Sequence, residues 1–217
     1  MLLGELRAAV AAAGDRLAAA GLVPGTSGNL SARAGDLVAA TPSGLRCGGL
    51  RAEQVTVIDL DGNVVDGDLL PTSEVPLHLA VYRATDASAV AHAHAATSTA
   101  VSCTCEELPV HHYGVVALGG PPRVAAYATF GSDELAANAV AALEGGRRAV
   151  LLQNHGSLAL GHDLEEACDR LELLEWLCEV HLRVVQLGGG RTLSNAELDA
   201  VRLHLGSHRY GQRSPSA

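Results

Sequence analysis

The segment Ala91-His92-Ala93-His94 carries two imidazole side chains two residues apart. On a β-strand, residues i and i+2 point to the same face, so the two rings would converge on one point. On a helix the same spacing would turn them roughly 200° apart. Because imidazole is a common zinc ligand, the pair is either half of a metal site on a strand or two ordinary polar strand residues.

A third histidine, His155, follows the apolar run at 149–152 and precedes Gly156. Catalytic zinc commonly takes three protein ligands and leaves one position open. His92, His94 and His155 would supply three ligands. Taken alone, His155 is explained equally well as a hydrogen-bonded turn residue.

Glu74 stands at the start of a predicted helix. There the helix dipole stabilises a carboxylate, and helix-end electrostatics alone would account for the residue. The functional interpretation is a general base beside a metal, or a fourth ligand that swings away when substrate arrives. His78, one turn later, is expected on the helix surface.

Three short polar loops offer hydroxyls and open backbone N–H groups, which bind phosphate without lysine. The candidate residues are Thr26, Gly28 and Asn29 in the first loop, Ser43 and Gly44 in the second, and Thr72 and Ser73 in the third. Turn chemistry explains each loop equally well when it is considered alone.

The composition removes several classes of function. All 15 basic residues are arginine, so a Schiff base between lysine and a carbonyl substrate is excluded. The net charge of −9 and the 3% aromatic content argue against a binder of nucleic acid or of anionic membranes. No apolar run approaches about 18–20 residues, so no membrane span is expected. Five cysteines without a CxxC pair favour a reducing compartment, which predicts a cytoplasmic protein.

Hydrophobic periodicity and capping signals predict the secondary structure. Strands are expected at 29–33, 36–41, 89–94 and 147–153, with a hairpin at 55–67. Helices are expected at 3–20, from an N-cap at Ser73, at 97–105, from near Ser132, at 163–187 and from Ser194. Capping boxes are expected at Asp163/Glu166 and at Ser194/Glu197. No linker divides the chain, so residues 1–217 are predicted to form one α/β domain whose tail after about 206 is either mobile or docked on a partner.

Seven motifs occur in order along nearly the whole chain: GTSGNLSAR (25–33), TPSG (41–44), PTSEVPLHLAVYRA (71–84), AHAHAATSTAVS (91–102), HHYGVVALGG (111–120), YATFGSDEL (127–135) and LLQNHGSLALGHDLEEA (151–167). Through them the chain resembles the class II aldolase family, which includes L-fuculose-1-phosphate aldolase and L-ribulose-5-phosphate 4-epimerase. The likeness is greatest to the fuculose-phosphate enzymes, because of the motifs at 111–120 and 127–131.

The resemblance implies a three-layer α/β/α sandwich around a mainly antiparallel sheet, in a homotetramer with active sites between subunits. It implies that His92, His94 and His155 hold Zn²⁺, with Glu74 as acid/base. Thr26, Asn29, Ser43, Gly44, Thr72 and Ser73 would surround the phosphate. Tyr113 matches a tyrosine that reaches in from the neighbouring subunit, Phe130 matches an aldehyde-pocket residue, and Tyr210 matches a tyrosine that closes the site.

The expected activity is therefore reversible cleavage of an L-fuculose-1-phosphate-like ketose 1-phosphate to dihydroxyacetone phosphate and a small aldehyde. Mn²⁺, Co²⁺ or Fe²⁺ in place of zinc stays open, because metal supply and geometry decide this as much as ligand type. In the direction of condensation, Glu74 would remove a C–H proton from dihydroxyacetone phosphate and the neighbour's Tyr113 would protonate the aldehyde oxygen.

Three alternatives stay open: a phosphopentose 4-epimerase, a metal-dependent decarboxylase of a phosphorylated sugar acid, and a non-catalytic oligomeric binding module. The family's epimerases resemble a pattern with aspartate where this chain has Glu74, which favours an aldolase. Adducin-type heads lack the metal histidines, which this chain keeps. One departure is Thr72, where the fuculose-phosphate enzymes often have serine; the hydroxyl is kept and a methyl group is added.

Overall fold

The computed structural model describes residues 1–207. Its strands are β1 (Asn29–Ala34), β2 (Leu37–Ala40), β3 (Thr56–Asp59), β4 (Val64–Asp66), β5 (Ala89–Ala93), β6 (Val124–Ala125), β7 (Ala149–Leu152) and β8 (Gly156–Gly161). Its helices are α1 (Gly4–Ala19), α2 (Val75–Ala84), α3 (Ala96–Ser102), α4 (Asp133–Leu143), α5 (Leu164–Gln186) and α6 (Asn195–Ser207), with the 3₁₀ turns η1 (Ala52–Gln54) and η2 (Tyr113–Leu118).

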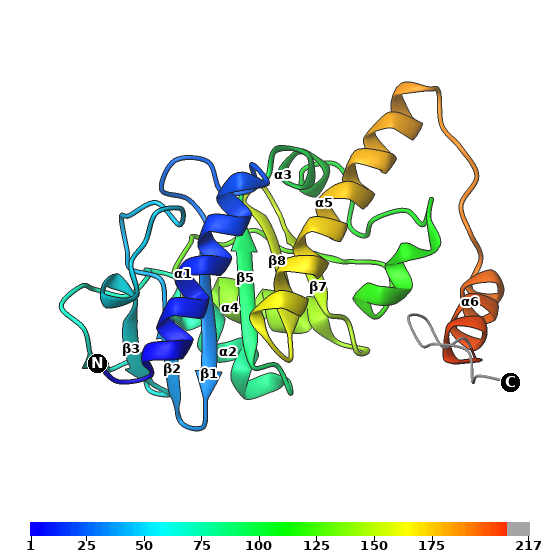
Figure 1. The fold of residues 1–217 in the computed structure, drawn as a ribbon. Coiled ribbons are helices and arrows are strands. Elements are labelled where there is room, and N and C mark those ends of the chain that lie inside the picture. Colours follow the sequence, from blue (N-terminus) through cyan, green and yellow to red (C-terminus); the bar gives the residue numbers. More distant parts are fainter. Residues whose placement is uncertain (208–217) are drawn as a thin grey trace, which may run out of the picture.

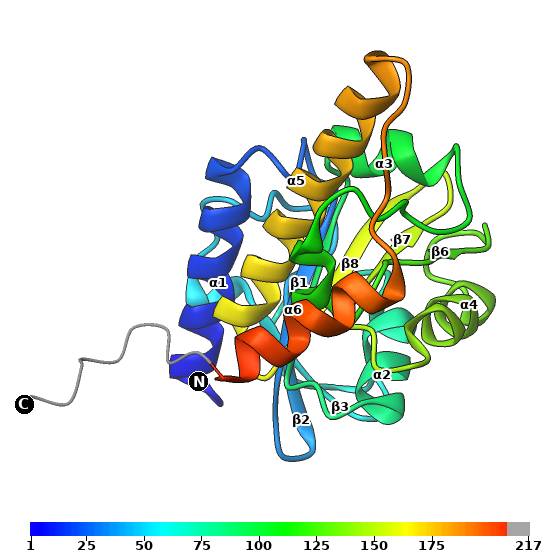
Figure 2. The same ribbon diagram turned by 90° about the vertical axis from the view of Figure 1, so that its right-hand side faces the viewer.

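All eight strands form one sheet in the order β4-β3-β2-β1-β5-β8-β7-β6. Every neighbouring pair is antiparallel except β6 and β7, which run parallel. Helices α1 and α5 cover one face of the sheet, and α2 and α4 cover the other (Figures 1 and 2). The predicted three-layer α/β/α sandwich around a mainly antiparallel sheet is confirmed.

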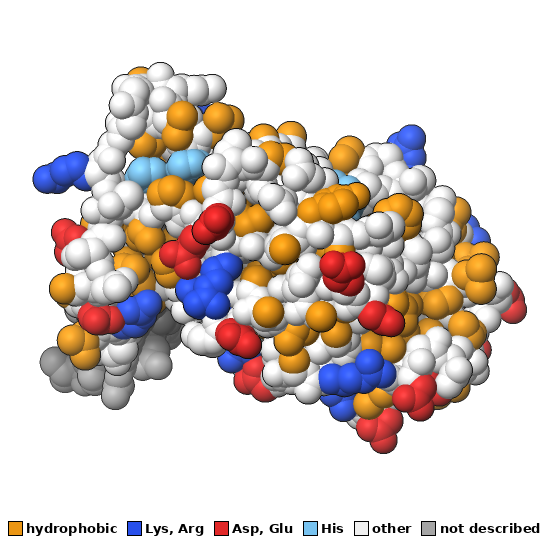
Figure 3. All heavy atoms as spheres, turned by 180° about the vertical axis from the view of Figure 1, so that it is seen from behind, with side chains coloured by type: hydrophobic (Ala, Val, Ile, Leu, Met, Phe, Trp, Pro, Cys, Tyr) orange, Lys and Arg blue, Asp and Glu red, His pale blue; other side chains and the backbone are white. Residues whose placement is uncertain are grey.

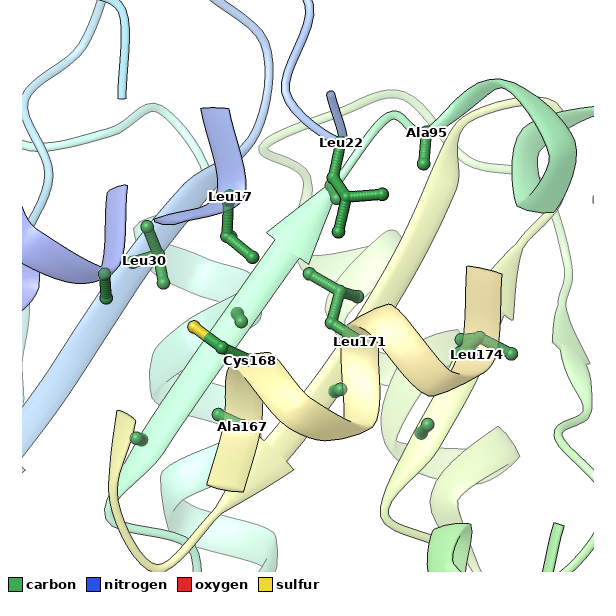
Figure 4. Close-up of a cluster of buried hydrophobic side chains, with 14 of the residues drawn as sticks. Leu17, Leu22, Leu30, Ala95, Ala167, Cys168, Leu171 and Leu174 are labelled. Carbon is green, nitrogen blue, oxygen red and sulfur yellow. The ribbon is translucent and has the colours of Figure 1, made fainter. Parts of the chain in front are cut away.

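The central strand β5 is buried on both faces and shows how the two cores divide. Ala89, Ala91 and Ala93 belong to the core under α1 and α5, whereas Val90 belongs to the core under α2 and α4. Successive strand residues point to opposite faces, so this alternation also directs His92 toward the α2 side. Leucines of α1 and α5 close over the alanine face (Figure 4).

Helix α2 begins differently from the expectation. The predicted N-cap, Ser73, is exposed, and Glu74 occupies the N-cap position with its side chain buried. The Thr72 hydroxyl accepts the Glu74 backbone N–H at 3.2 Å, which helps to hold this turn. A carboxylate that could have capped the helix is thereby directed into the interior.

The other helix starts largely follow the sequence signals. Ser132 accepts the N–H of Leu135, and Ser194 and Glu197 form the predicted reciprocal capping box. Asp163 caps α5 as expected, but the Glu166 carboxylate accepts the N–H of His162 instead of that of Asp163. The predicted box at α5 is therefore only half formed.

Some boundaries and two strands differ from the prediction. Helix α3 ends at Ser102 and not at 105, because the chain turns there with hydroxyls bonded to the last carbonyls. Strands β6 and β8 were not expected. Strand β6 has only two residues, and the apolar run at 158–160 in β8 is short and lies between glycines, a pattern that suits several structures.

The surface and the end of the chain complete the description. Acidic and arginine side chains are interspersed on the face shown in Figure 3. Within residues 1–207 no helix has the length and apolar character needed to cross a membrane. Tyr210 and most of the predicted tail lie outside the described residues.

Candidate metal centre and substrate cavity

Three strands bring the histidines together. His92 lies on β5, His94 follows the end of β5 by one residue, and His155 lies in the turn between β7 and β8. This turn approaches β5 very closely: a Cβ atom on Gly156 would lie 2.2 Å from the Ala93 carbonyl oxygen. Only glycine fits there. Because glycine has no side chain, the turn that carries His155 can pack against the end of β5.

Glu74 completes the cluster from the opposite layer. His92 Nε2 lies 2.9 Å from His94 Nε2 and 3.0 Å from Glu74 Oε2. His155 Nε2 lies 3.5 Å from Glu74 Oε1. One ligand atom from each of the four residues falls within 4.8 Å of all the others. Four donor atoms thus surround one point, although Glu74, the His92/His94 pair and His155 come from three segments that are well separated in the chain.

The cluster fits a divalent metal ion. Within residues 1–207 the buried Oε1 atom of Glu74 has no hydrogen-bond partner, which is costly unless a cation or a ligand satisfies it. His92 Nδ1 donates to the Ser157 carbonyl oxygen at 2.9 Å, so its Nε2 faces the cluster. A backbone acceptor behind a histidine ring is the usual arrangement around a metal-binding imidazole, and three imidazoles with a carboxylate suit zinc.

The protonation states favour the same interpretation. Burial and the neighbouring His92 lower the pKa of both His94 and His155 to about 4, so both rings are neutral near pH 7. Burial opposes ionisation of Glu74 and of His92, but the attraction between the two prevails: it lowers the pKa of Glu74 well below its usual range and raises that of His92. A metal that takes Nε2 of His92 as a ligand would therefore compete with a proton at this nitrogen.

The cluster lies at the floor of a cavity of about 340 Å³. All seven residues of the predicted phosphate loops line it: Thr26, Gly28, Asn29, Ser43, Gly44, Thr72 and Ser73. Glu74, His94 and His155 reach the cavity, whereas His92 is fully buried behind them. Loops that are separate in the sequence therefore form one polar wall next to the cluster of Glu74 and the histidines.

Of the two aromatic residues expected at the site that the structure describes, Phe130 lines the cavity and Tyr113 does not. Phe130 lines the same cavity and is 64% exposed. Tyr113 begins η2, stacks on His112 and is half exposed, but it does not line this cavity within residues 1–207. A single chain thus leaves Tyr113 apart from the cluster.

Two features of the site were missed in the sequence. Tyr127, Ala128 and Asn154 also line the cavity, and all three fall within the motifs at 127–135 and 151–167. His78 was expected on the helix surface, but it is 2% exposed and its Nε2 lies 2.5 Å from Asn29 Oδ1. Burial lowers the pKa of His78 to about 4, so this ring is neutral.

Comparison with known proteins gives consistent matches. Residues 8–182 match the family described as Class II Aldolase and Adducin N-terminal domain. The chain is 40% identical to a 5-methylthioribulose-1-phosphate/5-deoxyribulose-1-phosphate aldolase of Rhodospirillum rubrum, over 83% of this chain and 82% of the relative. It is 35% identical to a 5-deoxy-D-ribulose 1-phosphate aldolase of Bacillus thuringiensis serovar kurstaki, over 92% and 94% of the two chains. A solved structure of an L-fuculose 1-phosphate aldolase superposes with a TM-score of 0.88 at 36% identity, covering 93% of this chain and 96% of that one.

Proposed function

This chain belongs to the class II aldolase and adducin N-terminal domain family, and we propose that it is a zinc-dependent aldolase that reversibly cleaves a ketose 1-phosphate. The family expected from the motif order is confirmed. The products would be dihydroxyacetone phosphate and a small aldehyde. The observation that carries the proposal is the cluster of Glu74, His92, His94 and His155 at the floor of a cavity walled by phosphate-binding loop types.

His92, His94, His155 and Glu74 would hold the metal. When bound, the metal supplies Lewis-acid chemistry, polarising the substrate carbonyl and stabilising negative charge on its oxygen. Zinc is favoured because imidazole nitrogen dominates the donor set, although Mn²⁺, Co²⁺ and Fe²⁺ also accept these ligands.

Glu74 would act as the acid/base. Its Oε2 atom contacts Asn29 and His92, while Oε1 has no hydrogen-bond partner in the part of the chain that the structure describes and is available to a proton. In the direction of condensation, the carboxylate takes a proton from the hydroxymethyl carbon of dihydroxyacetone phosphate. That carbon then bonds to the aldehyde carbon, and in cleavage Glu74 returns the proton after the same bond breaks.

The polar loops would bind the phosphate. Thr26, Ser43, Thr72 and Ser73 offer hydroxyls on one wall of the cavity, and Gly28 and Gly44 add backbone that a side chain would not obstruct. The N-terminus of α2 begins at the same wall and favours an anion. These groups would orient a phosphorylated substrate with its carbonyl toward Glu74, without any lysine.

The remaining proton would come from a neighbouring subunit. Tyr113 is half exposed and lies away from the cavity of its own chain, so it is free to enter the site of another copy. We place it as the donor to the aldehyde oxygen in condensation, within a homotetramer whose active sites lie between subunits. The two proposed roles, Glu74 at carbon and Tyr113 at oxygen, balance the protons of the reaction.

The aldehyde end of the substrate would carry an apolar group. Tyr127, Ala128 and Phe130 line one side of the cavity and add apolar surface, with Asn154 as a polar neighbour. This wall suits a methyl or methylthio end better than a fully hydroxylated one. The names of the similar enzymes, for 5-deoxyribulose, 5-methylthioribulose and fuculose phosphates, all describe substrates with such an end.

The test is an assay of dihydroxyacetone phosphate released from three substrates: L-fuculose 1-phosphate, 5-deoxyribulose 1-phosphate and 5-methylthioribulose 1-phosphate. We expect release by the zinc-loaded protein from at least one of them, with none after EDTA treatment. Conversion of a pentulose phosphate to its epimer, or release of carbon dioxide from a phosphorylated sugar acid, in place of cleavage would favour the epimerase or decarboxylase. Failure to retain any divalent metal would favour a binding module.

A further inference from the structure

A continuous line of buried polar side chains leads away from Glu74 into the layer between β1 and α2. Asn29 Nδ2 donates to Glu74 Oε2 at 2.8 Å, and Asn29 Oδ1 lies 2.5 Å from His78 Nε2. His78 Nδ1 lies 2.6 Å from the Ser31 hydroxyl, which lies 2.7 Å from the Tyr82 hydroxyl. Each of these five residues is at most 5% exposed, so the line is made of protein groups shielded from solvent.

Regular secondary structure alone aligns this line. Asn29 and Ser31 are two residues apart on β1 and therefore share the face toward α2. His78 and Tyr82 are four residues apart on α2 and therefore share the face toward β1. The pair from β1 and the pair from α2 alternate along the line, so a strand and a helix hold all four side chains and no loop residue is needed.

Hydrogen-bond chemistry sets the direction of the whole line. The Glu74 carboxylate can only accept, so the Asn29 amide must turn its NH₂ group toward Glu74 and its oxygen toward His78. His78 must then donate from Nε2, which leaves Nδ1 as an acceptor. The Ser31 hydroxyl donates to Nδ1 and accepts from the Tyr82 hydroxyl. Every donor in the line thus points toward Glu74. The Asn29 amide, the His78 ring and the two hydroxyls can each satisfy this direction in only one orientation or tautomer.

We propose that His78 is a positioning residue, which holds the Asn29 amide so that it donates to Oε2 of Glu74 and leaves Oε1 for the metal and the proton. The catalytic part of this inference rests on the proposed aldolase function. The geometric part concerns only the orientation of Glu74 and its affinity for a metal.

The alternative orientation explains why such a residue is needed. An Asn29 amide turned by 180° would set its oxygen against the Glu74 carboxylate and lose the hydrogen bond. The donor at His78 Nε2 excludes this orientation, since it requires an acceptor opposite it. Removing outer partners of metal ligands typically costs 10–100-fold in metal affinity or activity.

Spectroscopy of the wild-type protein gives the first test. Long-range ¹H–¹⁵N NMR of the full chain, with and without zinc, should show His78 as the neutral Nε2–H tautomer. The His78 ring is assigned by comparing the spectrum with that of His78→Gln. The Nδ1–H tautomer, or a protonated ring near pH 7, would contradict the proposed direction of the line.

Variants give the second test. His78→Gln places an amide N–H near the position of Nε2 and should keep zinc affinity, measured by chelator competition, within about threefold of the wild type. His78→Asn is too short to reach Asn29 and should lose about 10–100-fold in zinc affinity and in kcat. A purely structural role for His78 would lower the melting temperature of both variants without separating their zinc affinities.

Ser31→Ala keeps the test decisive if His78→Asn does not fold. It removes the donor to Nδ1 and should increase the population of the wrong tautomer and weaken zinc binding. Ser102→Ala, which removes a buried hydroxyl bonded to the Thr99 carbonyl, should change neither. Wild-type zinc affinity in His78→Asn, or in Ser31→Ala where His78→Asn does not fold, would overturn the proposal. A change in zinc affinity without cleavage of any ketose 1-phosphate would instead refute the aldolase function and leave the positioning role standing.

Discussion

Asn29 on β1 lies directly opposite His92 on β5 in the antiparallel register. Residues in such a pair share a face of the sheet, so the amide that bonds Glu74 Oε2 and the imidazole that contacts the same oxygen are set by one strand pairing. A slip of the register by one residue would turn both side chains to the other face. The cluster of Glu74 and the three histidines therefore depends on the sheet as much as on its own four residues.

Glu74→Gln should abolish cleavage while leaving the fold intact. The amide is similar in shape but cannot take a proton from carbon, so we expect kcat to fall by about 10²–10⁴-fold. The measurement is dihydroxyacetone phosphate release by zinc-loaded protein. Glu134→Gln, an exposed carboxylate in the first turn of α4, is the matched control. Cleavage at the wild-type rate in Glu74→Gln would exclude Glu74 as the acid/base.

Removal of the metal should destabilise the protein. A metal that binds only the folded chain stabilises it by about 4 kcal/mol at a thousandfold excess over its Kd. EDTA should therefore lower the midpoint of thermal unfolding, and zinc should restore it. His155→Ala removes one of the four clustered ligand atoms and should lose most of this zinc-dependent shift. An equal response to zinc in His155→Ala and wild type would exclude His155 as a ligand.

Gly28 and Gly44 line the same cavity wall and both have φ of +75°, but only Gly28 is crowded. A Cβ atom on Gly28 would lie 2.5 Å from Val23 Cγ1 and 2.8 Å from the His92 carbonyl oxygen. A Cβ atom on Gly44 would have no atom within 4 Å among the described residues beyond its own chain neighbours. Gly44→Ala should cost about 1 kcal/mol of backbone strain. Gly28→Ala should lower the free energy of unfolding, measured by chemical denaturation, at least twice as much. It should also weaken zinc binding, because the backbone of His92 must shift. Equal costs in the two variants would contradict this packing argument.

The sequence was informative wherever spacing and secondary structure act together. The His92/His94 pair predicted a strand that presents both rings on one side, and β5 has this form up to Ala93. The order of the motifs predicted the family and the sandwich, both of which the comparisons confirm. The chemical roles of the site residues stay predictions, although the structure gathers the loop residues around one cavity.

What the sequence did not reveal depends on contacts between distant segments. His78 was placed on the helix surface because its neighbours on α2 give no hint that Asn29 and Ser31 lie opposite it. Ser73 was placed at the N-cap because a hydroxyl there is favourable locally, yet Glu74 holds that position and turns inward to the histidines. In both cases a tertiary contact outweighs a local preference.

Buried thiols should make the protein less stable at alkaline pH. Burial raises the pKa of Cys47 from 9.0 to about 11, so the unfolded chain loses this proton first as the pH rises. The contribution of Cys47 to stability is then constant below about pH 9 and falls between pH 9 and 11. Since one pKa unit is worth about 1.4 kcal/mol, Cys47 contributes up to about 3 kcal/mol to this loss. Cys47→Ala should flatten the decline in urea unfolding, and Cys103→Ala, which removes an exposed thiol, should not.

Hybrid assemblies test whether the active site is shared between subunits. Tyr113 does not line the cavity of its own chain within the described residues, so we expect each site to combine Glu74 of one subunit with Tyr113 of the next. Glu74→Gln and Tyr113→Phe homo-oligomers should both be nearly inactive. Dissociating and reassembling them together should restore part of the wild-type activity, because a Tyr113→Phe subunit supplies Glu74 while its Glu74→Gln neighbour supplies Tyr113.

The control for this experiment is reassembly of each variant with itself, which cannot create an intact site. If the site lay within one chain, every mixed assembly would contain only sites that lack Glu74 or Tyr113, and mixing would restore nothing. Light scattering under the same conditions should give the mass of a tetramer for active mixtures, since the sharing of Tyr113 requires a neighbouring copy. Full activity in a Tyr113→Phe homo-oligomer would instead remove Tyr113 from the reaction and require another donor to the aldehyde oxygen.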